Sequence, residues 1–323
     1  MLMGSEIKHA QLGVPSGESH TPLTESDIES NYLGQFIPLH YHHNMLMDEN
    51  RMRGFKSAIE YAVADGDKVL ELGGGTGVMS CFAAAKASKV WCVEFNPDMV
   101  AESRRLLALN PNGHKVEVVH ANAFQYLPPE SVDVVICEMI HVAMLREKQV
   151  EMIEAFKERY LRRFGGPLPR FIPEAVVMAV QPLQQTYEFF GFHAPIIQFQ
   201  RPGVHLAGTS ELAPPSVYSI LDFTQATSRE ITWEGAFTLE KNGLVNALRF
   251  VTKNILAVVP EQSTSINWLN DFLVLPLAEP LRCLAGDTLQ ISFHYQAGGS
   301  LQSLEKNIRV SVKKAAHTLM PAS

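Results

Sequence analysis

The hydrophobic pattern divides the chain into two halves. In the first, runs of consecutive apolar residues alternate with segments of helical spacing. Consecutive apolar runs are typical of strands buried on both faces, and their alternation with helices predicts a doubly wound, mostly parallel α/β sheet. The expected strands are Val69–Leu72, Val90–Val93, Val116–His120 and Val132–Cys137, and the expected helices are Val78–Ala87, Pro97–Leu109 and Lys148–Phe164.

The pattern changes after a breaker cluster, Gly165–Pro169. From about Phe171 onward, short apolar runs separated by turn residues predict an all-β half, a sandwich or a barrel. These runs are Ala175–Val180, Ile231–Leu239, Ala247–Val258, Phe272–Leu277 and Thr288–Tyr295.

The N-terminal stretch differs from both halves. Residues 1–27 are polar and lack a sustained period, which is typical of a flexible segment. One or two helices are expected between them and the first strand, because apolar and aromatic residues recur there at mixed helical spacing. We therefore expect three parts: a flexible segment (1–27), a Rossmann-like ligand-binding domain with N-terminal capping helices (28–172) and a β-barrel domain (173–323).

Composition limits the function classes. A net charge of −7 argues against nonspecific nucleic-acid binding, because phosphate neutralisation needs clustered Lys and Arg. The four cysteines form no paired motif and predict reduced thiols, hence a cytoplasmic location. No apolar run approaches a membrane span. The histidines of the segment His40–His43 lack a partner cluster elsewhere in the chain, so no metal is expected.

A glycine-rich turn joins the first predicted strand to its helix. Gly73, Gly75 and Gly77 let the backbone pass close under a ligand, and the helix N-terminus offers free N–H groups. Glu94 ends the next strand, where an acid can accept hydrogen bonds from ribose hydroxyls. This order of strand, turn, helix and acid predicts a nucleotide-type cofactor.

The residues of the turn restrict which nucleotide-type cofactor is expected. Glu71 lies two residues before the first glycine, where an acid would repel a pyrophosphate but suits a ligand with an amino group. The stretch resembles motif I of the S-adenosylmethionine-dependent methyltransferases. Arg51, which precedes the turn, could meet the carboxylate of such a zwitterionic cofactor.

Two acids follow the fourth predicted strand. Glu138 and Glu147 lie nine residues apart, a spacing that separates them on one helix or one strand. They converge only if the residues between them form a loop that turns back. Otherwise Glu138 would face solvent and Glu147 would be an ordinary acid near a helix N-terminus.

Together these motifs resemble the protein arginine methyltransferases, from Tyr32 onward. Two glutamates at this separation grip a guanidinium in that family, so the resemblance implies Glu138 and Glu147 as the catalytic pair. It also implies a cofactor-capping helix within His42–Ile59, a passage into the β-barrel at Ile172–Ala175 and a central barrel strand pair at Gly243–Leu256. The cofactor-binding residues implied are His42, Met45, Arg51, Glu71, Gly73, Gly75, Thr76, Gly77, Glu94, Phe95, Asn122, Ala123 and Glu138.

The substrate end departs from the family pattern. Met139, Ile140, His141 and Val142 stand where the family has Trp-Met-Gly-Tyr, and Asn267 stands where it has a histidine. Asn267 cannot take a proton, and His141 could supply a titratable group in its place or be structural. The substrate-pocket residues implied are Tyr32, Phe36, Met139, His141, Asn267 and Trp268.

The sequence therefore predicts an S-adenosylmethionine-dependent N-methyltransferase acting on an arginine guanidinium, in free L-arginine or in a protein or peptide. The alternatives are a natural-product N- or O-methyltransferase on the same scaffold and a non-catalytic partner. The number of methyl groups and the glutamate that accepts the proton stay open. Residues 191–219 occupy the place of the family's dimerisation arm, so we expect a homodimer, without nucleic-acid, membrane or metal partners.

Overall fold

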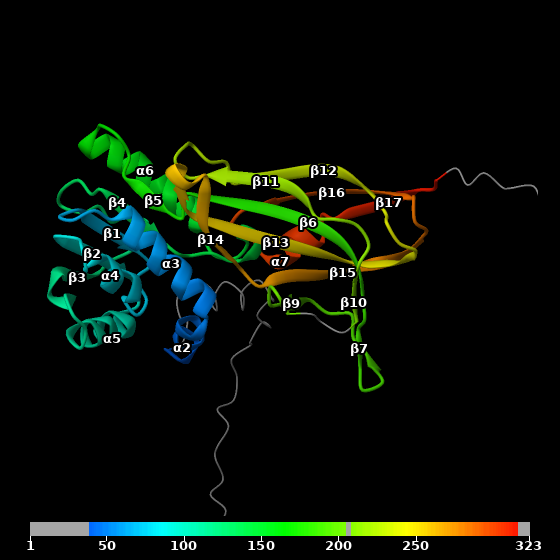
Figure 1. The fold of residues 1–323 in the computed structure, drawn as a ribbon, viewed down its shortest axis with the longest axis horizontal. Helices are drawn as coiled ribbons and strands as arrows, with labels where there is room; N and C mark the ends of the chain where they lie inside the picture. The colour runs from blue at the N-terminus through cyan, green and yellow to red at the C-terminus, as the bar shows by residue number, and fades with distance from the viewer. Residues whose placement is uncertain (1–38, 205–207, 316–323) are drawn as a thin grey trace, which may run out of the picture.

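The computed structural model describes residues 39–204 and 208–315. Figure 1 shows a parallel sheet with its helices at one end of the molecule and long antiparallel strands extending from it. The predicted fold class, a Rossmann-like α/β sheet followed by a β-rich half, is confirmed. The boundaries predicted for the three parts stay a prediction, and the segment 1–27 lies outside the described residues.

The parallel sheet has five strands in the order β3-β2-β1-β4-β5. The order in which the chain adds strands to the sheet therefore reverses between β1 and β4, which are direct neighbours and run parallel. In sheets of this kind ligands bind beyond the carboxyl ends of the strands at this reversal point. The strands are β1 (Lys68–Leu72), β2 (Lys89–Glu94), β3 (Val116–His120), β4 (Val134–Cys137) and β5 (Arg170–Ile172).

The helices lie close to their predicted ranges. The helix after β1 is shorter than predicted and ends at Ala83, while Asn96 caps its successor by accepting from the N–H groups of Asp98 and Met99. Two helices precede the sheet, as the mixed spacing predicts. The helices are α2 (Leu39–Met47), α3 (Glu49–Ala62), α4 (Val78–Ala83), α5 (Pro97–Ala108) and α6 (Gln149–Phe164), with short 3-10 turns η1 (Gly113–Lys115) and η2 (Val142–Met144).

The C-terminal half contains a seven-stranded antiparallel sheet. It follows the path β10-β6-β13-β15-β9, with β11 paired to β6 and β14 paired to β13. Its strands are β6 (Ala175–Gln185), β9 (Gln198–Gln200), β10 (Thr209–Glu211), β11 (Ser216–Asp222), β13 (Gly243–Val259), β14 (Thr264–Leu269) and β15 (Phe272–Cys283). The expected central strand pair is instead one long strand, β13, which continues through two register irregularities, at Val245/Ala247 and Ile255/Ala257.

A second antiparallel sheet, β12-β16-β17, and a small hairpin, β7-β8, complete the C-terminal half. The hairpin projects from the rest of the molecule in Figure 1. These elements are β7 (Glu188–Phe189), β8 (Phe192–His193), β12 (Glu230–Thr238), the 3-10 turn η3 (Pro260–Gln262), β16 (Thr288–Gln296), α7 (Leu301–Glu305) and β17 (Arg309–Lys313).

The two halves share one hydrophobic core. A single cluster of buried side chains includes Leu70 and Ile136 of the parallel sheet and Phe250 and Phe293 of the antiparallel sheets. Burial of apolar surface is the main favourable term in folding, so the halves stabilise each other. The shared core fixes the position of β14 opposite the carboxyl ends of β1 and β4.

Candidate functional site

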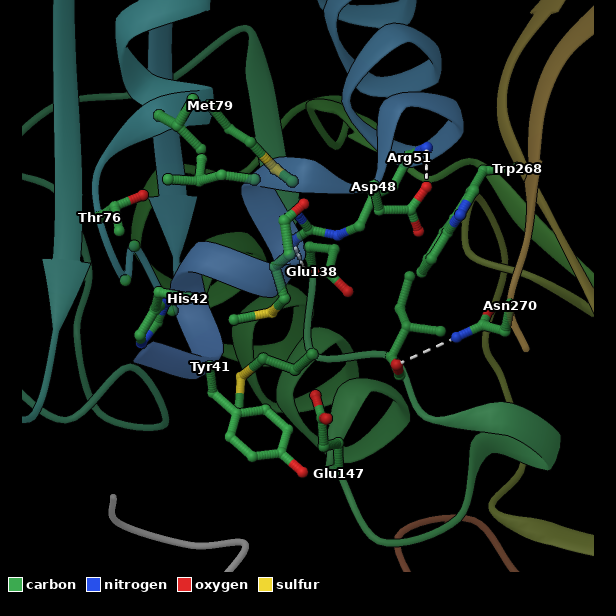
Figure 2. A pocket seen from close by; sticks show the side chains of 18 of the residues that line it. Tyr41, His42, Asp48, Arg51, Thr76, Met79, Glu138, Glu147, Trp268 and Asn270 are labelled. Atoms are coloured by element: carbon green, nitrogen blue, oxygen red, sulfur yellow. Dashed lines mark hydrogen bonds and ion pairs between the residues drawn. The ribbon is translucent and has the colours of Figure 1, made fainter. Parts of the chain in front are cut away.

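A cavity of about 2010 Å³ lies where the carboxyl ends of the parallel strands face α2, α3 and β14. Figure 2 shows side chains from these elements pointing into one space. The cavity is lined by the turn Gly73–Thr76, by Glu94 and by both glutamates of the predicted pair. The loop geometry that the glutamate spacing requires is therefore present.

The glycine-rich turn follows β1 without a break. Gly73 and Gly75 have positive φ angles of 80° and 51°, which side chains rarely adopt. A Cβ at Gly75 would lie 2.9 Å from a ring carbon of His42. The N–H of Gly75 donates to the Glu94 carboxylate at 2.9 Å, and the other Glu94 oxygen accepts from the N–H of Asn96 at 2.8 Å. His42 of helix α2 thus lies against Gly75 of the turn, and the Glu94 carboxylate binds the N–H of the same glycine.

Arg51 extends from α3 toward the end of β4. Asp48 caps this helix by accepting from the Arg51 N–H at 3.0 Å. The Arg51 guanidinium forms an ion pair with the Glu138 carboxylate and lies 5.9 Å from the centre of the Trp268 ring. Both side chains of the ion pair are largely buried, at 9% and 12% exposure. Arg51 therefore links α3, β4 and β14 at one point of the cavity.

Glu71 lies on β1 beneath the turn and is almost fully buried. Its carboxylate accepts hydrogen bonds from both the N–H and the hydroxyl of Ser80 in α4. Burial raises the pKa of Glu71 to about 7, although the bonds from Ser80 oppose the shift. Because one oxygen already accepts from Ser80, the expected contact of Glu71 with a ligand's amino group stays a prediction.

Glu138 and Glu147 stand at the two ends of a loop that contains η2. Burial, followed by the charge of Glu138, raises the pKa of Glu147 to about 8, while Arg51 and Arg146 oppose the shift. Both carboxyl groups line the same cavity. Two neighbouring carboxylates in a partly desolvated site favour a proton or a cation between them.

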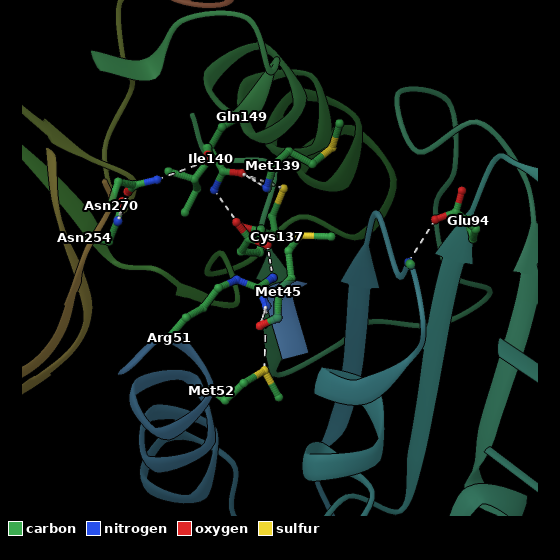
Figure 3. A network of polar contacts seen from close by, with 12 residues as sticks. Met45, Arg51, Met52, Glu94, Cys137, Met139, Ile140, Gln149, Asn254 and Asn270 are labelled. Carbon is green, nitrogen blue, oxygen red and sulfur yellow. Dashed lines mark hydrogen bonds and ion pairs between the residues drawn. The ribbon is translucent and has the colours of Figure 1, made fainter. Parts of the chain in front are cut away.

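Gln149, at the start of α6, holds the strand end that carries Glu138. Its amide N–H donates to the Cys137 carbonyl at 2.6 Å, and its amide oxygen accepts from the Met139 N–H at 2.9 Å (Figure 3). Gln149 is fully buried. The sequence analysis missed it, because a glutamine one residue inside a helix carries no pattern that distinguishes it from a surface residue.

Some of the predicted substrate-pocket residues line the cavity and one does not. Met139 and Trp268 line the cavity, and Asn267 lines it while donating to the Ser265 carbonyl at 3.2 Å. His141 is not among the lining residues; its ring packs against Phe199 at 5.8 Å and donates to the Val142 carbonyl at 3.0 Å. Burial lowers the pKa of His141 to about 4, so it is neutral at pH 7.

Most predicted cofactor-binding residues lie together. The cavity is lined by all of them except Gly77, which caps α4 instead. Tyr32 and Phe36 lie outside the described residues. The binding roles themselves stay predictions. Residues at the cavity that the sequence analysis did not select include Asp48, Arg146, Arg201, Asn270 and Asp271.

Residues 69–163 match a family model described as a methyltransferase domain. An uncharacterized protein of Methanocaldococcus jannaschii is 26% identical over 83% of the chain and 96% of its own length. A probable histone-arginine methyltransferase of Oryza sativa is 29% identical over 62% of the chain, which spans 42% of that relative. The chain is an arginine methyltransferase-like enzyme.

Solved structures agree on the fold of this arginine methyltransferase-like enzyme. Protein arginine methyltransferase 10 of Arabidopsis thaliana, in an open conformation, superposes with a TM-score of 0.68 at 17% identity, covering 90% of this chain and 96% of that one. A Trypanosoma brucei protein arginine methyltransferase 1 complex gives 0.62 at 17% identity, covering 84% and 96%. At such identity the likeness shows the fold alone.

The cofactor prediction, S-adenosylmethionine, is confirmed. The cavity of the arginine methyltransferase-like enzyme fits this molecule: the close-approach glycines, the Glu94 carboxylate and the Arg51 guanidinium line one space. Among residues 39–204 and 208–315, no group of three or more His, Cys, Asp or Glu side chains is placed to hold a metal ion. No helix within those ranges is long and apolar enough to cross a membrane.

Proposed function

We propose that the enzyme transfers a methyl group to a guanidinium nitrogen of arginine. The observation that supports this most is the carboxylate pair Glu138 and Glu147, which lines the same cavity as the glycine-rich turn. A guanidinium keeps its charge at any ordinary pH and matches a pair of carboxylates through charge-assisted hydrogen bonds. Glu138 already pairs with one guanidinium, that of Arg51.

Each end of the cavity has its own task in this proposal. S-adenosylmethionine, when bound, supplies a methyl group on a sulfonium centre. Glu94 accepts hydrogen bonds from its ribose, Asn122 and Ala123 flank its adenine, and Arg51 meets its carboxylate. Glu138 and Glu147 hold the substrate guanidinium so that one terminal nitrogen faces the cofactor.

The carboxylate pair can also accept the proton that the guanidinium nitrogen loses when it is methylated. A guanidinium nitrogen that gains a methyl group must lose a proton, and a carboxylate in hydrogen-bond contact can accept it. Burial raises the pKa of Glu147 to about 8, which makes it a stronger base than an exposed glutamate. Glu138 can fill the same role, and both stay candidates.

We favour free L-arginine or a similar small guanidino compound over a protein substrate. The loop that shapes the substrate side carries Met139–Val142 in place of the family residues, and Asn267 replaces its histidine. These changes leave the cofactor side intact and alter the substrate side alone. They also support the alternative that another small-molecule nitrogen or oxygen is methylated.

To test this, the purified enzyme is incubated with S-adenosylmethionine and one of three candidate substrates: free arginine, an arginine-rich peptide or lysine. Mass spectrometry of the products should find methylarginine in the first reaction and none with lysine. The control is Glu147→Gln, which should bind the cofactor by calorimetry but yield no product. The guanidinium assignment fails if neither arginine substrate is methylated while a labelled-cofactor screen of metabolites finds another product.

A homodimer is a further part of the proposal. The hairpin β7-β8 projects from the molecule, and its apolar side chains Phe190 and Phe192 are exposed together with the nearby Ile196. Exposed apolar patches of this kind mark interaction sites. Sedimentation of the enzyme as a monomer at micromolar concentration would contradict the dimer.

A cytoplasmic location is the last part. The cysteines Cys81, Cys92, Cys137 and Cys283 are all free, and most are buried. Free thiols persist in reducing compartments. Fractionation of the producing cells, followed by detection of the enzyme, tests the location directly.

A further inference from the structure

The loop between the two glutamates is held by the C-terminal half of the molecule in a backbone conformation that it would not adopt alone. Three of its residues, none of them glycine, have positive φ angles: Ala143 at 58°, Met144 at 53° and Arg146 at 64°. L-residues rarely adopt such angles, because Cβ approaches the following carbonyl oxygen. They persist only where the surroundings determine them.

Ala143, at the middle of the loop, is held on both of its backbone groups. Its N–H donates to the Thr252 hydroxyl on β13 at 2.7 Å. Its carbonyl accepts from the Tyr295 hydroxyl on β16 at 2.9 Å. Since that bond uses the Tyr295 proton, the Tyr218 hydroxyl on β11 is the donor in its 2.8 Å contact with Tyr295.

All of these groups are removed from water. Ala143 and Thr252 have no exposed surface, and Tyr295 and Tyr218 are 3% and 7% exposed. A buried hydrogen bond cannot be replaced by one to solvent, so losing one leaves an unsatisfied group and frees the backbone that it held. These contacts are therefore specific determinants of the loop conformation.

Further contacts hold the loop on either side of Ala143. The Met144 carbonyl accepts from the N–H of Gly298, and the Arg146 N–H donates to the Gly299 carbonyl at 2.6 Å. Toward Glu138, the Asn270 amide donates to the Ile140 carbonyl at 3.3 Å and accepts from Asn254 at 2.6 Å (Figure 3). The C-terminal half thus holds the loop at several points between the glutamates.

We propose that Thr252 and Tyr295 are positioning residues that set the placement of Glu147 relative to Glu138. Neither lines the cavity, and each acts through the backbone of Ala143. The proposal rests on the proposed function only in that the carboxylate pair must bind a substrate cation. It assigns to the C-terminal half a part in catalysis besides substrate binding and dimerisation.

The experiment replaces Thr252 by Val, which keeps the shape and removes the acceptor, and by Ser, which restores it. Tyr295→Phe removes the donor to Ala143. Its matched control is Tyr187→Phe, because Tyr187 is also buried and its hydroxyl has no hydrogen-bond partner in the described part of the chain. For each variant we measure kcat, the KM of both substrates and amide hydrogen exchange over residues 140–147.

Thr252→Val and Tyr295→Phe should lower kcat about tenfold to a hundredfold, because small displacements of positioning groups have large effects on rate. The KM for S-adenosylmethionine should stay near the wild-type value, and exchange in the loop should increase. Thr252→Ser should recover most of the rate, and Tyr187→Phe should behave as wild type.

Two results overturn the proposal. One is a wild-type rate and wild-type loop exchange in both Thr252→Val and Tyr295→Phe; the other is an equal loss of rate in Tyr187→Phe. If one variant fails to fold, the other and Thr252→Ser still decide. Hydrogen exchange needs no substrate, so it tests the loop even if the guanidinium assignment fails, and that failure is seen separately as inactivity of the wild type on arginine.

Discussion

The guanidinium of Arg51 and the carboxylate of Glu138 form an ion pair between α3 and the end of β4. The Arg51 guanidinium thus contacts the Glu138 carboxylate, which in our proposal binds the substrate guanidinium. The Arg51 guanidinium is also the group that we assign to the cofactor carboxylate. Under the proposed function, the contact of Arg51 with Glu138 therefore couples the cofactor end of the cavity to the substrate end.

Removal of Arg51 should weaken both the fold and the cofactor site. Arg51→Met leaves the buried Glu138 charge without its partner, which costs on the order of 3 kcal/mol in the free energy of unfolding. Affinity for S-adenosylmethionine should also fall, by about tenfold or more, because a charge-assisted hydrogen bond is lost. Urea denaturation and calorimetry measure the two effects.

Arg53→Met is the matched control on the same helix. Arg53 pairs with Glu49, but both side chains are largely exposed, at 79% and 85%. Exposed pairs contribute little to stability, so this variant should lose less than about 1 kcal/mol. Equal losses in the two variants would show that the Arg51–Glu138 contact has no special role.

The pH dependence of stability should reveal Glu147. Its pKa is about 8 in the folded chain against an ordinary value of 4.5, so the folded state holds the proton more tightly than the unfolded state. Stability without ligands should therefore fall as pH rises from about 4.5 through 8, because the unfolded state then binds fewer protons. Thermal melts across this range should show a decline that is smaller in Glu147→Gln. An unchanged pH dependence in that variant would assign the titration to another group.

The sequence predicted the parts of this site that depend on local pattern. The glycine turn, Glu94 and the strand ends follow from short-range rules, since parallel strands bring their carboxyl ends to one edge. The convergence of Glu138 and Glu147 could not be derived from spacing alone, because it depends on a loop with left-handed residues. The family resemblance supplied that part.

Other features had no sequence signal. Thr252 and Tyr295 come from strands, and Asn270 from the connection between β14 and β15, that follow the loop by more than a hundred residues. Alternation along a strand predicts which residues are buried, but not which backbone group a buried hydroxyl contacts. The strand pair expected at Gly243–Leu256 came from the family resemblance, and the structure has one strand there, β13.

Substrate affinity should also depend on pH. A guanidinium binds the carboxylate pair when both members are ionised, and the pKa of Glu147 is raised to about 8. The KM for arginine should therefore decrease as pH rises from 6 toward 9. The KM for S-adenosylmethionine is measured alongside, because Glu71, one of its predicted ligands, has a pKa of about 7 and titrates in the same range. Steady-state kinetics over this range measures both, and an arginine KM independent of pH would contradict the assignment.

His141 should take no part in that pH profile. Its pKa is lowered to about 4 and its ring donates to the Val142 carbonyl outside the cavity. His141→Gln should therefore keep the pH profile of the wild type. If His141 performed the role of the family histidine that this chain lacks, the same substitution would change the profile. Loss of the profile in this variant would return His141 to the catalytic site.

Gln149 should be required for the placement of Glu138. Gln149→Leu leaves the Cys137 carbonyl and the Met139 N–H buried without partners, at about 1–3 kcal/mol for each group. The free energy of unfolding should fall accordingly, and turnover should fall further than cofactor affinity, because the strand end beside Glu138 becomes free to move. Gln290→Leu is the control, since Gln290 is exposed on β16. Denaturation and calorimetry, together with arginine turnover, separate the effects; a variant with wild-type stability and turnover would show that Gln149 does not hold the strand end.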